Sequence, residues 1–381
     1  MPSPSPYYTA EHEAFRDQVR RFVAEEITPH INEWDEAETF PRELYKRTAE
    51  LGFLGLGYPE AYGGVEVPDR FYGLIFAEEL SKCGSGGIQA SLFSHGISIP
   101  PIVATGTEEQ KQRFIPPVLA GDKISALAIT EPSGGSDVAN LKTTARREGD
   151  YYIVNGSKTF ITSGVRADQY TVAVRTGDPG MGGISMLVIE ADTEGFSRTA
   201  LKKMGWWCSD TATLYFDNCK VPVENRLGQE NHGFIAIMRN FNDERLALAG
   251  QAYGLARCAI EEATDYARER QTFGKPLIKN QAIRHKLVDM NMRVNAVKAT
   301  LENLTYRIDQ GEAPIAELCM LKNLSTSTLE YVAGEAVQIL GGAGFMRGCK
   351  SERIFRETKV LSIGGGASEI MKDLASRQMG Y

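Results

Sequence analysis

Hydrophobic positions in the first third of the chain recur at three- and four-residue spacing, which is the period of amphipathic helices. Thr9 opens this region with a sequence typical of a capping box. The pattern predicts helices over residues 9–29, 42–51, 71–82, 88–98 and 107–119. Glycines punctuate residues 52–64, which predicts a loop there.

The pattern changes near residue 121, where short apolar or β-branched runs alternate with turn residues. These runs predict strands over residues 125–130, 151–155, 159–162, 169–174, 184–189 and 213–216. Gly149-Asp150 and Asn155-Gly156 stand where hairpin turns would be. We therefore expect a β-domain, built as a small barrel or sandwich.

Helical periodicity returns after Pro222 and continues to the end of the chain. The predicted helices cover residues 234–269, 280–310, 315–340 and 368–379. Their short connections favour an antiparallel four-helix bundle. The predicted fold class is α+β, with an N-terminal helical domain over 1–120, a middle β-domain over 121–230 and a C-terminal four-helix bundle over 231–381.

Composition excludes several classes of protein. The net charge of −7 over 381 residues leaves no basic excess for nucleic-acid phosphates. The sequence contains no apolar run of about eighteen residues, so no membrane span is expected, and residues 1–9 do not resemble a targeting signal. Five histidines and six scattered cysteines predict no metal site, and they favour reduced thiols in a cytoplasmic protein.

Two glycine-rich stretches are candidates for binding chemistry. Residues 130–137, Thr-Glu-Pro-Ser-Gly-Gly-Ser-Asp, end a predicted strand and form either a structural turn or a loop that binds a polar heterocycle or phosphate. Residues 364–366 are three consecutive glycines. They form either a flexible connection or a place where backbone N–H groups closely approach a ligand.

Four stretches, in order along the chain, resemble signatures of the acyl-CoA dehydrogenases. They are residues 130–137, Lys-Thr-Phe-Ile-Thr at 158–162, Glu-Arg-Gln-Thr-Phe-Gly-Lys at 269–275 and Gln-Ile-Leu-Gly-Gly-Ala-Gly-Phe at 338–345. The resemblance covers essentially the whole chain, including its order of helical, β and helical regions. It implies FAD-dependent conversion of an acyl-CoA thioester to a trans-2-enoyl-CoA by a homotetramer, with electrons passing to electron-transfer flavoprotein.

The resemblance also implies contacts for residues of the middle region. Thr130 would hydrogen-bond the pyrimidine edge of the flavin, and Phe160 would lie against the flavin ring. Thr162 would contact flavin N5 or the ribityl chain. Ser136 would reach the CoA portion of the substrate.

A second set of residues is implied to bind the FAD of a neighbouring subunit. Arg270, Thr272 and Phe273 resemble the elements that grip the FAD pyrophosphate. Gln338 and Gly342 would hold the adenine-side phosphate. Arginine suits a diphosphate because its planar fork can bind two oxygens together. These assignments require at least a dimer.

The catalytic base departs from the commoner pattern of the family. Many members carry the base within Tyr-Glu-Gly-Thr-Ser, at the position of Gly365, and this chain has no carboxylate there. Glu369 lies four positions later and is expected on the cofactor side or on the helix surface. Isovaleryl-CoA and long-chain acyl-CoA dehydrogenases instead have Glu-Arg at the positions of Glu244 and Arg245. The resemblance therefore implies that Glu244 is the base rather than an ordinary solvated helix residue.

The neighbours of Glu244 have narrower expected roles. Burial beside the acyl chain and the flavin should raise the pKa of Glu244, and Gly365 would donate its backbone N–H to the thioester oxygen. Arg245 would orient Glu244 or bind the CoA end of the substrate, with a plain salt bridge as the alternative. Asn242 is a further candidate substrate contact. Asp243 is about 100° away around the helix and is expected on the surface or near CoA.

The substrate and the reaction class each leave alternatives. Residues 86–96 are rich in small side chains, which favours a deep pocket for branched isoprenoid acids, such as citronellyl-CoA, or long straight chains; isovaleryl-CoA stays open. Trp206-Trp207 could pack an interface or narrow an entrance. The same fold also serves flavin monooxygenases and nitroalkane-oxidase-like enzymes, against which Glu244 and Ser136 argue.

Overall fold

The N-terminal region is helical in the computed structural model, which describes residues 5–381 except for the side chains of residues 239 and 240. Its helices are α1 (Ala10–Phe22), continued by a π-helix over Val23–Ile27, α2 (Ile31–Glu36), α3 (Glu43–Glu50), α4 (Phe71–Leu80), α5 (Gly86–Leu92), α6 (His95–Ser98), α7 (Pro100–Thr105), α8 (Glu108–Phe114) and α9 (Pro116–Leu119). Thr9 caps α1, accepting a hydrogen bond from His12 N, which confirms the predicted start. The helix predicted over 107–119 is interrupted, because Pro116 and Pro117 lack the N–H groups that would continue it.

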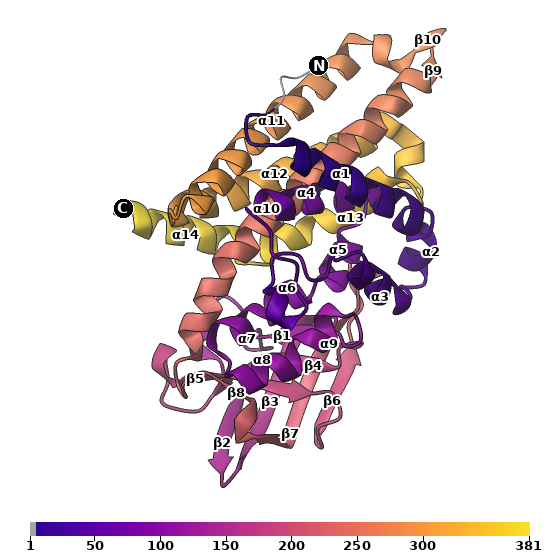
Figure 1. Ribbon diagram of the computed structural model, residues 1–381. Helices are drawn as coiled ribbons and strands as arrows, with labels where there is room; N and C mark the ends of the chain where they lie inside the picture. Colours follow the sequence, from indigo (N-terminus) through magenta and orange to yellow (C-terminus); the bar gives the residue numbers. More distant parts are fainter. Residues whose placement is uncertain (1–4) are drawn as a thin grey trace.

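The middle region is one eight-stranded sheet with the order β6-β7-β3-β2-β4-β5-β8, and β1 pairs in parallel with β4. The strands are β1 (Ser125–Ala128), β2 (Thr144–Glu148), β3 (Tyr151–Thr162), β4 (Gln169–Arg175), β5 (Ile184–Glu190), β6 (Phe196–Ala200), β7 (Thr211–Pro222) and β8 (Arg226–Leu227). Figure 1 places this sheet at one end of the molecule. The predicted turn at Gly149-Asp150 is confirmed, because it joins the antiparallel β2 and β3.

The hairpin predicted at Asn155-Gly156 is wrong. Both residues lie within the continuous strand β3, whose register against β7 shifts between Val154 and Gly156. Gly156 has φ +141°, and a Cβ there would lie 2.7 Å from the Thr143 hydroxyl. The glycine therefore permits a β-bulge and a close approach of the backbone to Thr143, and it does not form a turn.

The C-terminal region is helical and contains α10 (Gly233–Glu269), α11 (Gln281–Asp309), α12 (Ile315–Leu340), α13 (Lys350–Ile363) and α14 (Ser368–Met379). A small hairpin of β9 (Gln271–Thr272) and β10 (Lys275–Pro276) joins α10 to α11. α12 packs against each of the other four helices. The structure thus confirms the α+β class and the helical C-terminal region. None of the helices it describes has the length and apolar character needed to cross a bilayer.

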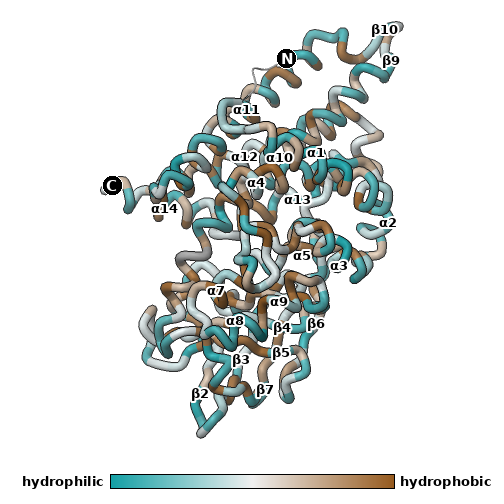
Figure 2. The backbone as a smooth tube through the Cα atoms, viewed as in Figure 1, coloured by the Kyte–Doolittle hydropathy of each residue, from teal (hydrophilic) through white to brown (hydrophobic). Residues whose placement is uncertain are grey.

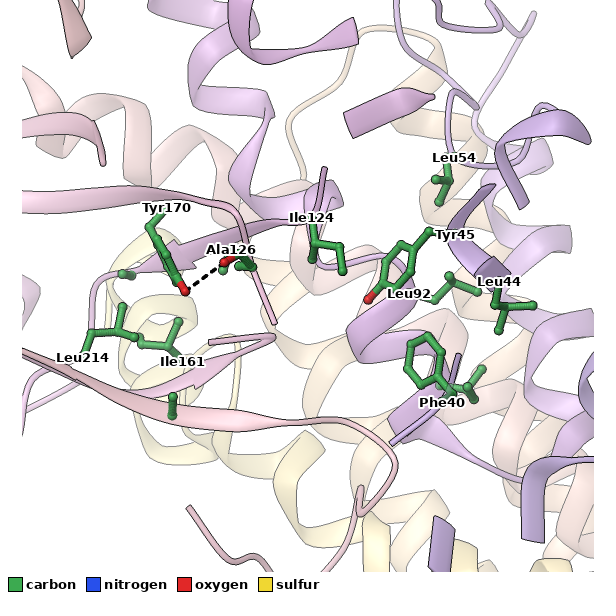
Figure 3. Packing of buried hydrophobic residues seen from close by; sticks show 14 of the residues in the cluster. Phe40, Leu44, Tyr45, Leu54, Leu92, Ile124, Ala126, Ile161, Tyr170 and Leu214 are labelled. Atoms are coloured by element: carbon green, nitrogen blue, oxygen red, sulfur yellow. Dashed lines mark hydrogen bonds between the residues drawn. The ribbon is translucent and has the colours of Figure 1, made fainter. Parts of the chain in front are cut away.

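Hydrophobic packing joins the N-terminal helices to the sheet. Figure 3 shows Tyr45 of α3 and Leu92 of α5 in the same buried cluster as Ile161 and Leu214 of the sheet. α10 crosses between two further clusters: Ile237 belongs to one shared with the sheet, and residues from Ala249 onward belong to the bundle core. Glu244 lies on the stretch of α10 between them.

Trp206 and Trp207 pack within the chain. The guanidinium carbons of Arg347 and Arg356 lie 4.3 Å and 3.8 Å from the centre of the Trp207 ring. A Cβ on Gly86 would lie 2.6 Å from Trp206 Nε1, and one on Gly87 would lie 3.0 Å from the Trp206 Cα. The small residues at the start of α5 therefore admit Trp206, so the prediction that they deepen a substrate pocket does not hold for these two glycines.

Candidate active site

The structure brings Glu244 and Gly365 together. Glu244 lies on α10, and Gly365 lies in the connection between α13 and α14. A Cβ built on Gly365 would lie 3.6 Å from Glu244 Oε1. A side chain at position 365 would thus point at the Glu244 carboxylate, so the two positions open onto the same space.

The surroundings of Glu244 suit a proton acceptor. Burial raises the pKa of this carboxyl to about 7, against the opposing charges of Arg245 and Lys322. A carboxyl whose pKa lies near the working pH is matched to general-base catalysis. Glu369, the other nearby carboxylate of the sequence, is exposed at the start of α14, as expected.

Arg245 lies beside Glu244 with unused hydrogen-bonding capacity. Its side chain is buried, and Nη1 donates to Asn242 Oδ1 at 2.8 Å. Its Nε is buried without a partner among the described residues, and Arg245 forms no ion pair among them. The plain salt bridge is therefore not what the structure shows. Asp243 is exposed, and its carboxylate lies 3.5 Å from Arg70 Nη2, in agreement with the predicted surface position.

The predicted flavin contacts of the middle region lie on two adjoining segments. Thr159 N donates to Thr130 O at 2.8 Å, which joins β3 to the loop that follows β1. Phe160 has φ +60°, and the residue is 70% exposed. Thr162 ends β3, and Ser136 is exposed in the loop next to Thr130. Thr130, Phe160 and Thr162 therefore share one region of the sheet.

A buried ion pair holds this loop, and the sequence analysis missed it. Lys158 Nζ lies 2.8 Å from Glu131 Oε1, and both side chains are almost fully buried. Glu131 also accepts hydrogen bonds from the backbone N–H groups of Lys142 (2.6 Å) and Thr143 (2.8 Å). Burial alone would raise the pKa of the Glu131 carboxyl, but Lys158 and these donors lower it to about 2. Both residues belong to motifs that the sequence shows, but neither motif indicates that the two side chains pair.

We expect Lys158→Met to lower the free energy of unfolding by about 3–5 kcal/mol at pH 7, because it leaves a buried carboxylate without its partner. Burial lowers the pKa of Lys158 to about 8, so both partners are ionised between about pH 4.5 and 8. Since the folded-state pKa of Glu131 is depressed, the contribution of the pair is lost as pH falls from about 4.5 towards about 2. The loss in the variant should therefore shrink below pH 4.5. Denaturant titrations at several pH values measure this difference.

Lys142→Met is the matched control for that experiment, because the Lys142 side chain is exposed and only its backbone N–H contacts Glu131. It should change stability by less than about 0.5 kcal/mol. Equal losses in the two variants would contradict a structural role for the Lys158–Glu131 pair.

The residues predicted to bind a neighbouring FAD lie elsewhere. Arg270 is exposed where α10 ends, and Phe273 is 98% exposed at the tip of the β9–β10 hairpin. Gln338 and Gly342 are exposed where α12 ends. At about 1.5 Å rise per residue, the segment of α10 from Glu244 to Arg270 spans about 39 Å. Figure 1 accordingly shows the hairpin at the opposite end of the molecule from the sheet. One chain does not bring its two sets of predicted FAD contacts together.

The residues at both ends fit FAD. Phe160 presents an exposed ring from a strand, as a partner for a flat heterocycle would. Thr272 Oγ1 is buried without a partner among the described residues, so a hydroxyl is available beside the exposed Arg270 cation. Diphosphate oxygens would satisfy both groups.

Comparisons with known proteins show the family. Family models described as the N-terminal, middle and C-terminal domains of acyl-CoA dehydrogenase match residues 9–122, 126–219 and 231–380. Acyl-CoA dehydrogenase AFT10-1 of Alternaria alternata is 39% identical over 97% of this chain and 91% of its own. Two further relatives are each 35% identical to this chain. Isobutyryl-CoA dehydrogenase of Bos taurus matches over 99% of this chain and 90% of its own, and the long-chain specific enzyme of Mus musculus matches over 98% of this chain and 87% of its own.

Solved structures show the same fold. A putative acyl-CoA dehydrogenase from Mycobacterium smegmatis is 44% identical, with 99% of each chain covered and a TM-score of 0.96. A glutaryl-CoA dehydrogenase from the same organism, in complex with FADH2, is 28% identical over 99% of this chain and 96% of that one, with a TM-score of 0.93. The chain belongs to the FAD-dependent acyl-CoA dehydrogenase family of oxidoreductases.

Proposed function

We propose that this enzyme removes the α-proton of an acyl-CoA thioester with Glu244 and forms a trans-2-enoyl-CoA. The observation that carries the proposal is the 3.6 Å between Glu244 Oε1 and the position of a Cβ on Gly365. The Glu244 carboxylate on α10 would thus act in the same space that a side chain at position 365 would reach. The pKa of about 7 supports proton transfer at neutral pH.

The other residues of the site prepare the substrate. The Gly365 N–H would donate to the thioester oxygen, which stabilises the negative charge that develops as the α-proton leaves. The chemistry that FAD supplies when bound is acceptance of the β-hydride. Arg245 and Asn242 would orient the Glu244 carboxylate or the CoA end of the substrate. Ser136 would contact the CoA portion.

We propose a long-chain or branched acyl group, including isoprenoid types, as the substrate. Leu248 occupies the space beside Gly365, because a Cβ there would lie 2.3 Å from Leu248 Cδ1. An apolar side chain thus takes the place of the polar one that many family members carry at this position. The named relatives include isobutyryl-CoA and long-chain enzymes, so both branched and long chains belong in the test.

The assembly we propose is a homotetramer. The separation of about 39 Å along α10 supports an assembly of at least two copies, because Arg270, Thr272 and Phe273 would then contact the FAD of a second copy. We further propose electron-transfer flavoprotein as the acceptor. A cytoplasmic location is supported by six free cysteines, of which five are buried thiols.

Anaerobic mixing of the FAD-loaded enzyme with acyl-CoAs of graded length and branching tests the function. The flavin absorbance should bleach fastest with the preferred acyl group, and oxidised electron-transfer flavoprotein should restore it faster than O₂ does. Fast reoxidation by O₂ with an oxygenated product would favour a flavin monooxygenase. Bleaching by nitroalkanes alone would favour a nitroalkane-oxidase-like enzyme, and either result would overturn the proposal.

A further inference from the structure

We propose that Lys322 is a positioning residue of the active site: from α12 its ammonium group holds the Gly366 carbonyl and so fixes the three-glycine connection opposite Glu244. This inference rests on the proposed role of Glu244 as the base. It adds a second task for Lys322: Gly366 adjoins Gly365, whose Cβ position lies 3.6 Å from Glu244 Oε1, so the ammonium group is close enough to act on that carboxylate. The sequence gives no hint of either task, since a lysine in a helical pattern is usually solvated.

The contact is direct, and it comes from a fully buried lysine. Lys322 Nζ donates to Gly366 O at 2.8 Å, and the residue is 0% exposed. The next residue, Asn323, donates from Nδ2 to Ser368 O at 2.9 Å. Two consecutive side chains of α12 therefore hold one carbonyl group of the connection and one at the first residue of α14.

This connection needs an external anchor. Glycines place few limits on φ and ψ, and Gly365 and Gly366 occupy the left-handed region at +63° and +104°. Apolar contacts bound the loop on its sides: Cβ atoms on these glycines would lie 2.3 Å from Leu248 and 2.4 Å from Met371. Lys322 and Asn323 supply polar anchors. Without them, the Gly365 N–H would sample several directions instead of one.

Lysine is a costly choice for a merely structural anchor. Burial lowers its pKa to about 8, although Glu244 opposes that change. Lys322 forms no ion pair with any side chain that the structure describes, and a buried ammonium without a close carboxylate destabilises a fold. A neutral donor, such as the neighbouring Asn323, would hold a carbonyl at less cost. The charge itself therefore has a use, which is to favour the ionised form of Glu244.

The charged and titratable groups around Glu244 are few. On α10 the neighbour is Arg245, and on α12 they are Lys322 and the buried thiol of Cys319. Residues 364–368 contain no titratable side chain. On α14 the buried residues are Met371 and Ala375, whereas Glu369, Lys372 and Asp373 are exposed. Loss of the Lys322 charge would leave Arg245 as the only cation acting on Glu244 among the described residues.

Three variants of the full-length, FAD-loaded enzyme separate the two tasks. Lys322→Met removes the donor and the charge, Lys322→Gln keeps a donor without the charge, and Asn323→Ala removes only the neighbouring anchor. Hydrogen exchange of the peptide over residues 361–370, without substrate, reports on the loop. The pH dependence of flavin bleaching at saturating acyl-CoA reports on Glu244.

We expect Lys322→Met to speed amide exchange in this peptide about tenfold, as local opening becomes easier. The acid limb of its pH profile for flavin bleaching should move up by about 1 pH unit, since an adjacent cation lowers a carboxyl pKa by about that much or more. Lys322→Gln should show the shifted limb with smaller exchange changes. Asn323→Ala should show faster exchange and an unshifted limb.

An unshifted acid limb in both Lys322 variants would overturn the inference, even if their stability fell, because a structural role alone predicts that result. Exchange at the wild-type rate in Lys322→Met would overturn the anchoring role. These failures are distinct from failure of the proposed function. If Glu244→Gln bleaches normally with acyl-CoA, Glu244 is not the base; if it is inactive while the Lys322 variants behave as wild type, only this inference fails.

Discussion

Glu244→Gln should slow flavin bleaching by acyl-CoA about 10²–10⁴-fold, which is the usual contribution of a positioned general base. The amide cannot accept the α-proton, yet it matches the carboxylate in size. FAD should stay bound, because the substitution is on α10, whereas the predicted cofactor contacts Thr130 and Phe160 lie in the loop after β1 and on β3. Stopped-flow absorbance under anaerobic conditions measures the rate, and the flavin-to-protein absorbance ratio measures cofactor content.

Asp243→Asn is the matched control, because this neighbouring carboxylate is exposed and lies 3.5 Å from Arg70. It should bleach within about threefold of wild type, as expected for a surface change of less than about 0.5 kcal/mol. The assignment of Glu244 would fail if Glu244→Gln kept a near wild-type rate, or if Asp243→Asn were equally slow.

Glu244→Gln should also change stability with a defined pH dependence. Burial raises the folded-state pKa of Glu244 from 4.5 to about 7, so the protonated carboxyl favours the fold below about pH 4.5 and that advantage is lost as pH rises through 7. The neutral amide avoids the cost of a buried charge. The variant should therefore unfold at a higher temperature than wild type at pH 8, and the gap should narrow at pH 5. Such an exchange of stability for activity is common at catalytic sites.

The elements that the sequence predicted well are those with long, regular hydrophobic periods. α10 and α12 begin and end within one residue of the predicted positions, because each buries one continuous face. β2 and β6 were missed because these strands bury few of their residues. Figure 2 shows β2 and its turn as hydrophilic. Only pairing with β3 and β7 identifies them as strands.

The candidate site divides in the same way. Glu244 and Gly365 could be named from motifs, because the carboxylate that many family members carry at position 365 is absent and a glutamate stands at position 244 instead. The Lys158–Glu131 pair and Lys322 could not be assigned tasks, because charged side chains carry no hydrophobic signal and their burial depends on contacts distant in sequence. Residues 27 and 44 positions apart meet in these contacts, and no local pattern records that.

Gly365→Glu in a Glu244→Gly background should restore part of the lost activity, because a side chain at 365 points into the space that Glu244 serves. A Cβ at 365 would lie 3.6 Å from Glu244 Oε1, so the new carboxylate would approach the substrate from the opposite side of the same space. Recovery should be about tenfold over Glu244→Gly, a fraction of the about 10²–10⁴-fold that a well-placed base supplies.

Two features of position 365 limit that recovery and supply its control. The backbone is left-handed at φ +63°, where side chains are strained, and a Cβ would lie 2.3 Å from Leu248 Cδ1. Adding Leu248→Ala should therefore raise the rate of the double variant further, by relieving this contact. The same Leu248→Ala change in Glu244→Gly alone should recover nothing, because it adds no base. Anaerobic bleaching rates across the series measure the recovery. If Gly365→Glu does not raise the rate of Glu244→Gly, even with Leu248→Ala added, then carboxylates at positions 244 and 365 do not remove the same proton.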